Sequence, residues 1–502
     1  MPAARYLLGI DQGSSGSRAL LLDAEGTPRG YGYRPLARLH PRPGWVEQDP
    51  WAVSQGVSEA ITEALAAANA RPTEVAAVGI ACQRNTEFAW EVATRRPVGH
   101  AISWQDLRTL PMVEEVAAWE HGRETRHRLG YAPGPYSSAL HIAWRMRHEP
   151  GFAAAARAGR LQLGLSAEWL LQALGEAAGH AMDVSLVQAM GLYDFRAGGY
   201  WADWLDFLGI PRAPLPDAVP SVHEFGALRL LGADGEAALV PVLAMIGDQQ
   251  GALFGYDCRQ PGDAECTHGT ASFVDVCVGS SAPQQERVNV YYAWRIGPTT
   301  TYCLEADTTV SGAVIRWLRE RARLFDRDEE VGPLATSVPD AGGVVFVPAF
   351  TGLNVPYNDQ AARGTLLGLT LGSSRAHIVR AFLDSLGYQV RAILDRIRAD
   401  TGLTVDRLYL GGGVSVSDVA CQIQADLLGM PTVRPQFTET TARAAALLAG
   451  LGAGWWPSLA ALPTLPSGAT VFEPRLSADE RDVGYARWKR AVEAVRLFGA
   501  GE

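Results

Sequence analysis

The opening of the chain alternates short apolar runs with small polar residues. Residues 6–10 are apolar, residues 12–16 are rich in glycine and serine, and residues 18–23 and 28–33 form two further alternating runs. An apolar run that ends in a small polar turn and continues as an alternating run is typical of a β-hairpin. The pattern therefore predicts a hairpin with a polar loop at its mouth, followed by a third strand.

A helical pattern follows this hairpin. Apolar residues recur every four positions within residues 51–69, which predicts an amphipathic helix. Residues 75–81 then form a short apolar run, which predicts a buried strand. Strands that alternate with helices indicate an α/β fold.

A second copy of the opening pattern lies about half the chain further on. Residues 263–266 lead into a turn over residues 267–272, and residues 273–278 are again apolar. Gly13 and Gly269, one in each turn, are 256 residues apart. A chance resemblance of two Gly/Ser turns would produce the same pattern. Two related domains would instead place both turns on one central cleft, where they could hold one phosphate chain from two sides.

The length of the chain supports two domains. With 502 residues it is too long for one hydrophobic core. The boundary is expected near residues 251–255, which divides the chain into residues 1–251 and residues 252–502. Hydrophobic residues make up 47% and charged residues 20%, an ordinary globular composition.

Charge, cysteine content and apolar stretches argue against nucleic acid, zinc and a membrane as partners. The net charge of -10 and a pI near 5.6 disfavour nucleic acid. The six cysteines are sparse and show no zinc ligand set, which is typical of reduced thiols in a cytosolic protein. The N-terminus lacks a signal-peptide pattern, and the longest apolar stretch, residues 444–456, is too short to span a bilayer. We expect a cytoplasmic protein with no membrane partner.

Lysine is almost absent, and this excludes three further classes of protein. The single lysine, Lys489, lies in residues 483–498, which read as a surface helix. A Walker-type phosphate loop, a pyridoxal enzyme and a protein kinase each need a lysine at the reacting centre. A lysine on a surface helix serves none of them.

The first candidate site is the segment from Asp11 to Arg18. Its small residues, with Gly13, Ser14 and Ser15 at the centre, let backbone N–H groups and hydroxyls approach phosphate oxygens. Arg18 can add a charge-assisted hydrogen bond, and Asp11 can hold Mg²⁺ through water. A plain hairpin turn with a solvated arginine is the alternative.

Two further candidates follow apolar strands. Asp248, next to Gln249, suits a general base with a substrate-positioning neighbour, although a helix N-cap at this position is equally plausible. Gly411, Gly412 and Gly413 let a ligand lie close to bare backbone. The glycine run alone is a weak signal.

Arg84, Asn85, Trp104 and Tyr136 form a fourth candidate set. Arg84 follows the end of a predicted strand, and the aromatic side chains offer flat faces to sugar C–H groups and polar tips for hydrogen bonds. Core packing is the alternative for Trp104 and Tyr136.

Taken together, these segments resemble the FGGY carbohydrate kinases, and most closely the glycerol kinases. The resemblance runs nearly the whole length of the chain, in ordered segments at residues 9–13, 44–50, 83–84, 102–106, 135–139, 247–255, 347–353, 361–365 and 449–451. It implies a two-domain, actin-like ATPase fold (ribonuclease H-like) with a central cleft. It also implies that ATP is the phosphoryl donor and that a small polyol or sugar is the acceptor.

The resemblance assigns roles to individual residues. It implies that Asp248 is the general base, that Asp11 supports Mg²⁺, and that the substrate contacts match Arg84, Trp104, Tyr136, Asp248 and Gln249. It implies a nucleotide site made of Gly13, Ser14, Ser15, Arg18, Gly269, Thr270, Gly312, Gly412, Gly413 and Ser417.

The chain departs from the glycerol kinase pattern at several positions. Asn85 stands where glycerol kinases have glutamate, and an amide donates as well as accepts hydrogen bonds. This change favours a longer polyol or a ketose. His141 replaces a lysine, and Ser417 replaces an asparagine. The segment Leu410-Gly411-Gly412-Gly413 replaces a pattern that has an aspartate before the glycine pair.

Three functions are therefore compared. The first is a glycerol-like polyol kinase, the second is a kinase of a ketopentose or longer polyol, and the third is an actin-like ATPase that signals to a protein partner. A homodimer or homotetramer is expected from the family. The sequence does not define the acceptor's length, the nucleotide base preference or any regulation.

Overall fold

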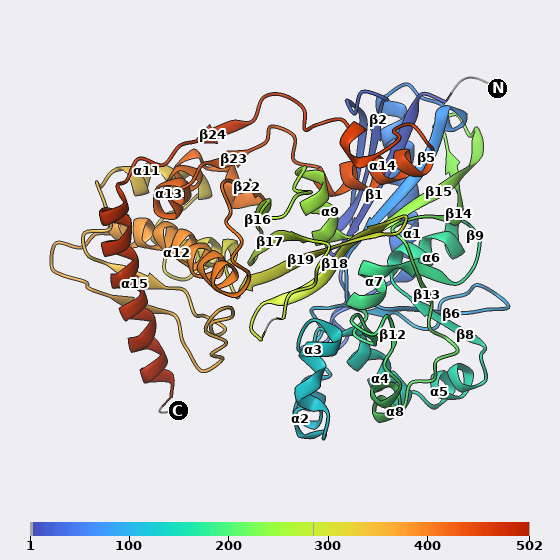
Figure 1. Ribbon diagram of the computed structural model, residues 1–502, viewed down its shortest axis with the longest axis horizontal. Helices are drawn as coiled ribbons and strands as arrows, with labels where there is room; N and C mark the ends of the chain where they lie inside the picture. The colour runs from blue at the N-terminus through green and yellow to red at the C-terminus, as the bar shows by residue number, and fades with distance from the viewer. Residues whose placement is uncertain (1–3, 285, 501–502) are drawn as a thin grey trace.

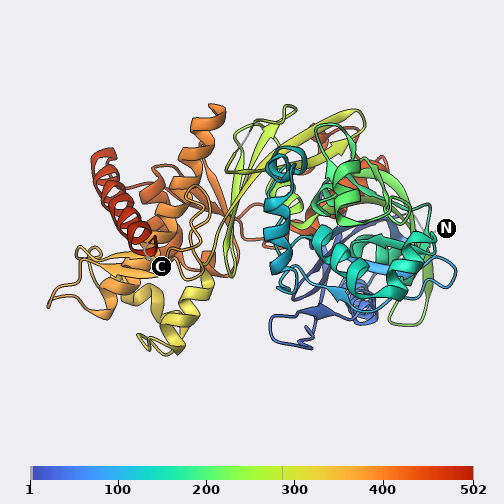
Figure 2. The same cartoon turned by 90° about the horizontal axis from the view of Figure 1, so that it is seen from below.

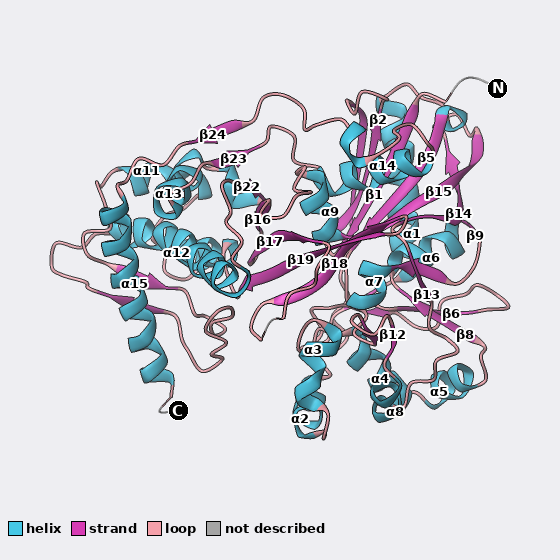
Figure 3. Ribbon diagram, in the orientation of Figure 1, coloured by secondary structure: helices cyan, strands magenta, loops and turns pink. Residues whose placement is uncertain are grey.

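Two seven-stranded sheets organise the chain (Figures 1 and 3). The computed structural model describes residues 4–284 and 286–500. The first sheet has the order β3-β2-β1-β5-β15-β14-β9, with β1 (Tyr6–Gly13), β2 (Gly16–Leu22), β3 (Pro28–Pro35), β5 (Val75–Cys82), β9 (Gly175–Ala177), β14 (Val222–Leu231) and β15 (Ala237–Gly247). The second has the order β18-β19-β17-β16-β22-β23-β24, with β16 (Ala264–His268), β17 (Ser272–Gly279), β18 (Asn289–Ile296), β19 (Thr299–Thr308), β22 (Leu408–Gly411), β23 (Thr432–Arg434) and β24 (Thr470–Phe472).

Helices and five small strand pairs complete the two domains. The helices are α1 (Pro50–Ala67), α2 (Leu110–Ala118), α3 (Thr125–Leu129), α4 (Ser138–His148), α5 (Pro150–Arg157), α6 (Ser166–Leu174), α7 (Val184–Ala189), α8 (Ala202–Leu208), α9 (Asp248–Gly255), α10 (Gly312–Glu320), α11 (Val331–Thr336), α12 (Arg375–Thr401), α13 (Asp418–Leu428), α14 (Thr440–Gly452) and α15 (Ala478–Gly499). The pairs are β4 (Glu47–Gln48) with β7 (Ala101–Ile102), β6 (Phe88–Glu91) with β8 (Leu161–Gly164), β10 (Ala181–Asp183) with β13 (Asp217–Val219), β11 (Tyr193–Asp194) with β12 (Gly199–Tyr200), and β20 (Val345–Val347) with β21 (Thr365–Leu367).

The two sheets share one core topology. Strand β1 pairs antiparallel with β2 and parallel with β5, and β15 continues parallel to β5. Strand β16 pairs antiparallel with β17 and parallel with β22, and β23 continues parallel to β22. The two Gly/Ser turns therefore join equivalent hairpins, β1–β2 and β16–β17. The pattern repeated in the sequence corresponds to a repeated topology.

The first hairpin is tighter than the sequence pattern predicts. The expected turn over residues 12–16 is wrong, because β1 continues through Gln12 and Gly13 pairs with Gly16. Only Ser14 and Ser15 form the turn. The buried Gln12 side chain accepts a hydrogen bond from Gln83 Nε2 at 3.1 Å, so a polar residue is satisfied inside the strand.

Two helices cover opposite faces of the first sheet. Successive residues of β1 point to opposite faces, so Leu7 packs in the cluster that contains α14 and Leu8 in the cluster that contains α1. Figures 1 and 2 show α14 within the N-terminal domain, although it comes late in the chain. The division of the chain at residue 251 remains a prediction. Helix α14 belongs to the second half of the sequence but lies on the first sheet.

Helix α14 lies unusually close to the first sheet because glycines face it. A Cβ atom added at Gly9 would lie 1.8 Å from the carbonyl oxygen of Ala442, and one added at Gly79 would lie 1.9 Å from that of Ala445. No side chain fits in such a space. The alanine-rich helix and the glycines of β1 and β5 thus allow helix and sheet backbones to make direct contact.

None of the helices within residues 4–284 and 286–500 combines the length and apolar composition that a membrane crossing requires.

The close contact of α14 gives a stability prediction. Gly79→Ala should lower the free energy of unfolding by about 1–3 kcal/mol or more, because its methyl group overlaps the α14 backbone. Chemical denaturation measures the change. Gly151→Ala is the matched control, because a Cβ added at Gly151 would have no atom of residues 4–284 or 286–500 within 4 Å. An equal loss in both variants would contradict the packing explanation.

Candidate active site

Three site residues lie at or just after the ends of neighbouring parallel strands of the first sheet. Asp11 lies near the end of β1, Arg84 follows β5, and Asp248 follows β15. Asp11 pairs with Ala81, and Cys82 pairs with Gly247, so the three strands end at one edge. The carboxyl ends of parallel strands are the usual position of ligands in α/β sheets.

Asp11 and Arg18 form an ion pair at this edge. Arg18 Nη1 lies 3.2 Å from Asp11 Oδ2, and Arg18 Nε lies 3.2 Å from Glu439 Oε2, just before α14. Burial raises the pKa of Asp11 to about 7; Arg18 opposes the rise, and Asp248 and Glu439 add to it. Arg18 is therefore not a solvated turn residue. Two carboxylates, Asp11 and Glu439, therefore share one guanidinium and leave negative charge that a cation would neutralise.

Arg84 links the two domains. Its Nη2 lies 2.6 Å from Glu305 Oε2 of β19, and its Nε lies 3.4 Å from Asp248 Oδ1. The guanidinium also lies over the ring of Tyr291 at 4.9 Å. Its side chain is only 10% exposed, so carboxylates from both domains are needed to compensate its desolvation.

Asp248 is the first residue of α9, and Gly247 occupies the N-cap position. The N-cap alternative for Asp248 is therefore wrong. Burial raises the pKa of Asp248, whereas Arg84 and the N–H of Gln249 lower it. The side chain is 28% exposed, so a ligand can reach it. A raised pKa and access to solvent are properties of a general base.

Trp104, Tyr136 and Asn85 lie beside this edge. Trp104 is 37% exposed and donates from Nε1 to Ser14 Oγ at 2.7 Å, so it is not a core residue. Tyr136 is half-buried and donates its hydroxyl proton to the carbonyl of Ala132, which leaves its oxygen free to accept. Asn85 has a φ of 59° and accepts a long hydrogen bond from the N–H of Ser138 at 3.5 Å.

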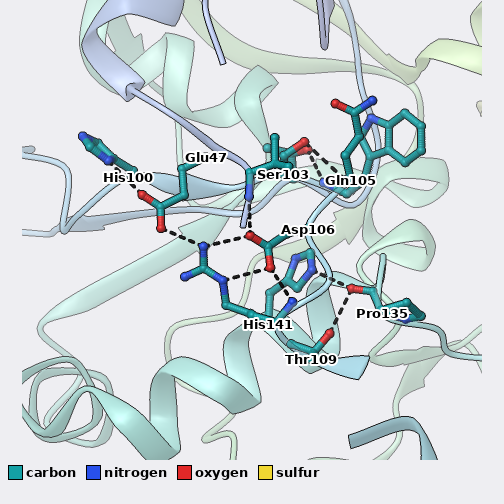
Figure 4. Close-up of polar contacts among 12 residues, drawn as sticks. Glu47, His100, Ser103, Gln105, Asp106, Thr109, Pro135 and His141 are labelled. Carbon is teal, nitrogen blue, oxygen red and sulfur yellow. Dashed lines mark hydrogen bonds and ion pairs between the residues drawn. The ribbon is translucent and has the colours of Figure 1, made fainter. Parts of the chain in front are cut away.

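A polar network around Asp106 holds the segment that contains Trp104 (Figure 4). The buried Asp106 carboxylate accepts from the Val46 N–H at 2.6 Å and from Arg108 Nε at 2.9 Å. Arg108 also donates to Glu47 Oε1 at 2.7 Å. Asp106 thus anchors the segment that bears Trp104.

His141 anchors the loop that leads to Tyr136. Figure 4 shows its ring next to Pro135, and its Nε2 donates a hydrogen bond to the Pro135 carbonyl oxygen at 2.8 Å. Its Nδ1 lies 3.0 Å from Glu87 Oε2, and both side chains are fully buried. His141, which stands where the family has a lysine, thus forms a buried pair with Glu87.

The predicted nucleotide residues of the second domain come together. The N–H of Gly312 donates to the carbonyl of Gly269 at 2.9 Å, and the N–H of Ser311 donates to that of Thr270 at 2.8 Å. Gly412 has a φ of 80°, and a Cβ there would lie 2.3 Å from the carbonyl oxygen of His268. One cluster at the ends of β16 and β22 thus contains Gly269, Thr270, Gly312 and Gly412.

This cluster fits a nucleotide. Its exposed residues are Gly269, Thr270, Gly412 and Gly413. In the described part of the chain, no atom lies within 4 Å of a Cβ added at Gly413. Bare backbone therefore borders open space, as close approach of a phosphate or base requires. Ser417 comes next, where its hydroxyl caps α13 by accepting from the Ala420 N–H at 3.3 Å. Its contact with a nucleotide remains a prediction.

Three buried carboxyl groups lie in a row across the second sheet. Glu265 of β16 pairs with Asp275 of β17, which pairs with Glu305 of β19. Burial raises the pKa of Glu265 to about 8, although a hydrogen bond from Thr267 at 2.9 Å lowers it. Burial also raises the pKa of Asp275 far above its usual range, and Glu305 and Glu265 add to the rise.

Sequence reasoning missed Glu305, Asp275, Glu265 and Glu439. A signal for the first two was present, because each is a carboxylate inside an otherwise apolar strand pattern, where a charge is costly without a partner. No local signal distinguished Glu439, because its partner Arg18 is far away in the sequence.

Comparison with known proteins identifies the family. The N-terminal domain model of the FGGY family of carbohydrate kinases matches residues 6–255, and its C-terminal domain model matches residues 264–453. The chain belongs to the FGGY family of carbohydrate kinases. It is a phosphotransferase that acts on an alcohol group, and its two-domain, actin-like fold is confirmed.

Relatives and solved structures agree with this assignment. The chain is 40% identical to a glycerol kinase of Symbiobacterium thermophilum over 99% of both proteins, and 37% identical to glycerol kinase 2 of Sulfolobus acidocaldarius over 98% of this chain and 97% of that protein. The crystal structure of Plasmodium falciparum glycerol kinase with ADP has a TM-score of 0.90 at 25% identity and covers 98% of each chain. A xylulose kinase from Rhodospirillum rubrum (TM-score 0.86, 22% identity, 99% and 100% covered) shares the fold.

The carboxyl row predicts how stability depends on pH. A carboxyl group with a raised pKa binds its proton more tightly in the folded state, so the free energy of unfolding falls as pH rises between about 4.5 and 8. Glu265→Gln should weaken this dependence. One pKa unit corresponds to about 1.4 kcal/mol, so the difference in stability between pH 5 and pH 8 should shrink by about that amount or more.

Denaturation curves recorded from pH 5 to pH 8.5 test this. Glu329→Gln serves as the control, because Glu329 is exposed and its loss should leave the pH dependence unchanged. If Glu265→Gln retains the wild-type dependence, the row does not determine it.

Proposed function

We propose that the chain transfers the γ-phosphoryl group of ATP to a hydroxyl of a small polyol, as a kinase of the glycerol kinase type. The observation that supports this best is the position of Asp248. It lies at the same strand edge as Asp11 and Arg84, and Arg84 joins it to the second domain, which has the exposed glycine cluster. The printed names of the most similar relatives agree with a glycerol-like acceptor.

In this mechanism Asp248 accepts the proton of the attacking hydroxyl. Its raised pKa brings its basicity closer to neutral pH, where a general base is most effective. Arg84 orients the carboxylate through Nε, and Trp104 and Tyr136 present faces and a hydroxyl to the acceptor. Asn85 and Gln249 supply amide groups for the remaining hydroxyls.

The phosphate chain lies between the two hairpin turns in this proposal. Backbone N–H groups and hydroxyls of Gly13, Ser14 and Ser15 approach it from one domain, and those of Gly269 and Thr270 approach it from the other. Arg18 donates to the transferred group and stabilises the charge on its oxygens. Phosphoryl transfer depends mainly on such positioning and charge neutralisation.

A magnesium ion fits beside Asp11. Carboxylate oxygens are the ligands that Mg²⁺ prefers, and the excess of carboxylates around Arg18 favours a cation. Mg²⁺ held there, through water, would neutralise phosphate charge. We also expect the chain to form a homodimer or homotetramer, as family members do, and to be located in the cytoplasm.

Removal of the base is the direct test. Asp248→Asn should lower kcat by about 10²-fold or more, because the amide cannot accept the hydroxyl proton. A coupled ATPase assay with a polyol acceptor measures kcat, and ATP affinity should change little. Asp203→Asn, at an exposed position in the N-terminal domain, is the control. Near-normal turnover in Asp248→Asn would reject Asp248 as the base.

The same assay separates the remaining alternatives. Mass spectrometry should detect a phosphorylated polyol in proportion to the ADP formed. ATP turnover with no phosphorylated small molecule would favour an actin-like ATPase that signals to a protein. A preference for ketopentoses over polyols would favour a sugar kinase.

A further inference from the structure

Asp307 lies on the same face of β19 as Glu305. Side chains two residues apart on a strand point to one face, and the two positions are about 6.6 Å apart. Glu305 faces Arg84 and, through it, Asp248. Asp307 therefore continues the lining of the site by one step, toward the Gly269–Thr270 turn, because the adjacent Thr308 pairs with Ser272.

The environment of Asp307 is that of a site residue. Asn354 Nδ2 donates to its Oδ2 at 2.6 Å, and the Asn354 oxygen accepts from Gln360 Nε2 at 3.3 Å. Asp307 is partly exposed. Among the described residues, no side chain donates a hydrogen bond to its other oxygen, Oδ1. Its charge also contributes to the raised pKa of Tyr136, after burial, which places Asp307 beside the predicted substrate contacts of the first domain.

Two further polar groups belong to residues that have already been assigned to the substrate site. Among the described residues, Arg84 Nη1 and the side-chain oxygen of Gln249 are buried and make no hydrogen bond. Buried polar groups without partners cost free energy that a ligand can recover. Together with Asp307 Oδ1, they offer one donor and two acceptors beyond the groups already assigned to the reacting hydroxyl.

A three-carbon acceptor has too few hydroxyls for this set. Asp248, Asn85 and Tyr136 already offer a partner to each of the three hydroxyls of glycerol. An acceptor with one or two more hydroxyls would satisfy Gln249 and Asp307 as well. Asp248 and Glu305 pair with Arg84, and Asp307 adds a further carboxylate two residues along β19 from Glu305. An acceptor with its own carboxylate would therefore be repelled.

We propose that Asp307, held by Asn354, is a specificity-determining residue that binds the distal hydroxyl of a neutral open-chain polyol of four or five carbons. This inference rests on the proposed polyol kinase function. It names the acceptor class for that site, and Asp307 takes no part in proton transfer.

The wild-type enzyme provides the first test. Initial rates with glycerol, erythritol, ribitol and xylitol should give a kcat/KM at least about tenfold higher for a four- or five-carbon polyol than for glycerol. A five-carbon aldonate should be a poor acceptor. A kcat/KM for glycerol equal to or above those of all the longer polyols would overturn the inference and leave the kinase function standing.

The variant provides the second test. Asp307→Ala should lower kcat/KM for the preferred longer polyol by about tenfold or more and for glycerol by less than about twofold. Asp307→Asn, which keeps the shape and one acceptor oxygen, should restore part of the loss. Glu329→Gln removes one exposed carboxylate of the same half and should change neither value.

The outcomes separate the two levels of the proposal. Equal losses for glycerol and for the longer polyol in Asp307→Ala would reject a specificity role. ATP hydrolysis with no phosphorylated acceptor in the wild-type enzyme would reject the kinase function and the inference together. If Asp307→Ala fails to fold, Asp307→Asn and the wild-type acceptor profile still decide the matter.

Discussion

The site depends on one buried guanidinium that both domains share. Arg84 lies 2.6 Å from Glu305 of the second domain and 3.4 Å from Asp248 of the first. A buried cation is tolerated only when carboxylates compensate its lost hydration, and here neither domain provides all of them. Docking of the two domains and orientation of Asp248 are therefore one event. The geometry of the base follows from the contact between the domains.

The repeated sheet core explains why the remaining groups meet at this contact. Both sheets have a hairpin on one side of a central strand and parallel strands on the other, and both place their small-residue turns at the carboxyl edge. Backbone N–H groups are therefore available from both sides, and side-chain chemistry is added at strand ends. Helix α14 reinforces this arrangement, because it returns from the second half to lie on Gly9 and Gly79 of the first sheet.

The fold class and most candidate site residues of the first domain could be predicted from the sequence because the signals are local. Asp11, Arg84 and Asp248 each come at the end of an apolar run or directly after one, and such runs are recognisable without long-range information. The length of the β1–β2 turn could not be predicted, since it depends on the hydrogen bond between Gln12 and Gln83 across neighbouring strands. Glu439 was missed because only the folded chain places it beside Arg18.

The sequence by itself determined the alternation of strands and helices, the repeated turns, the exclusion of lysine-dependent chemistry and the resemblance to a kinase family. Each of these is encoded in neighbouring residues. Tertiary structure alone decided which carboxylates share Arg84, which face of β19 lines the site and where α14 packs. Ion pairing and burial act between residues hundreds of positions apart, and their energies depend on distance and on exclusion of water, which exist only once the chain has folded.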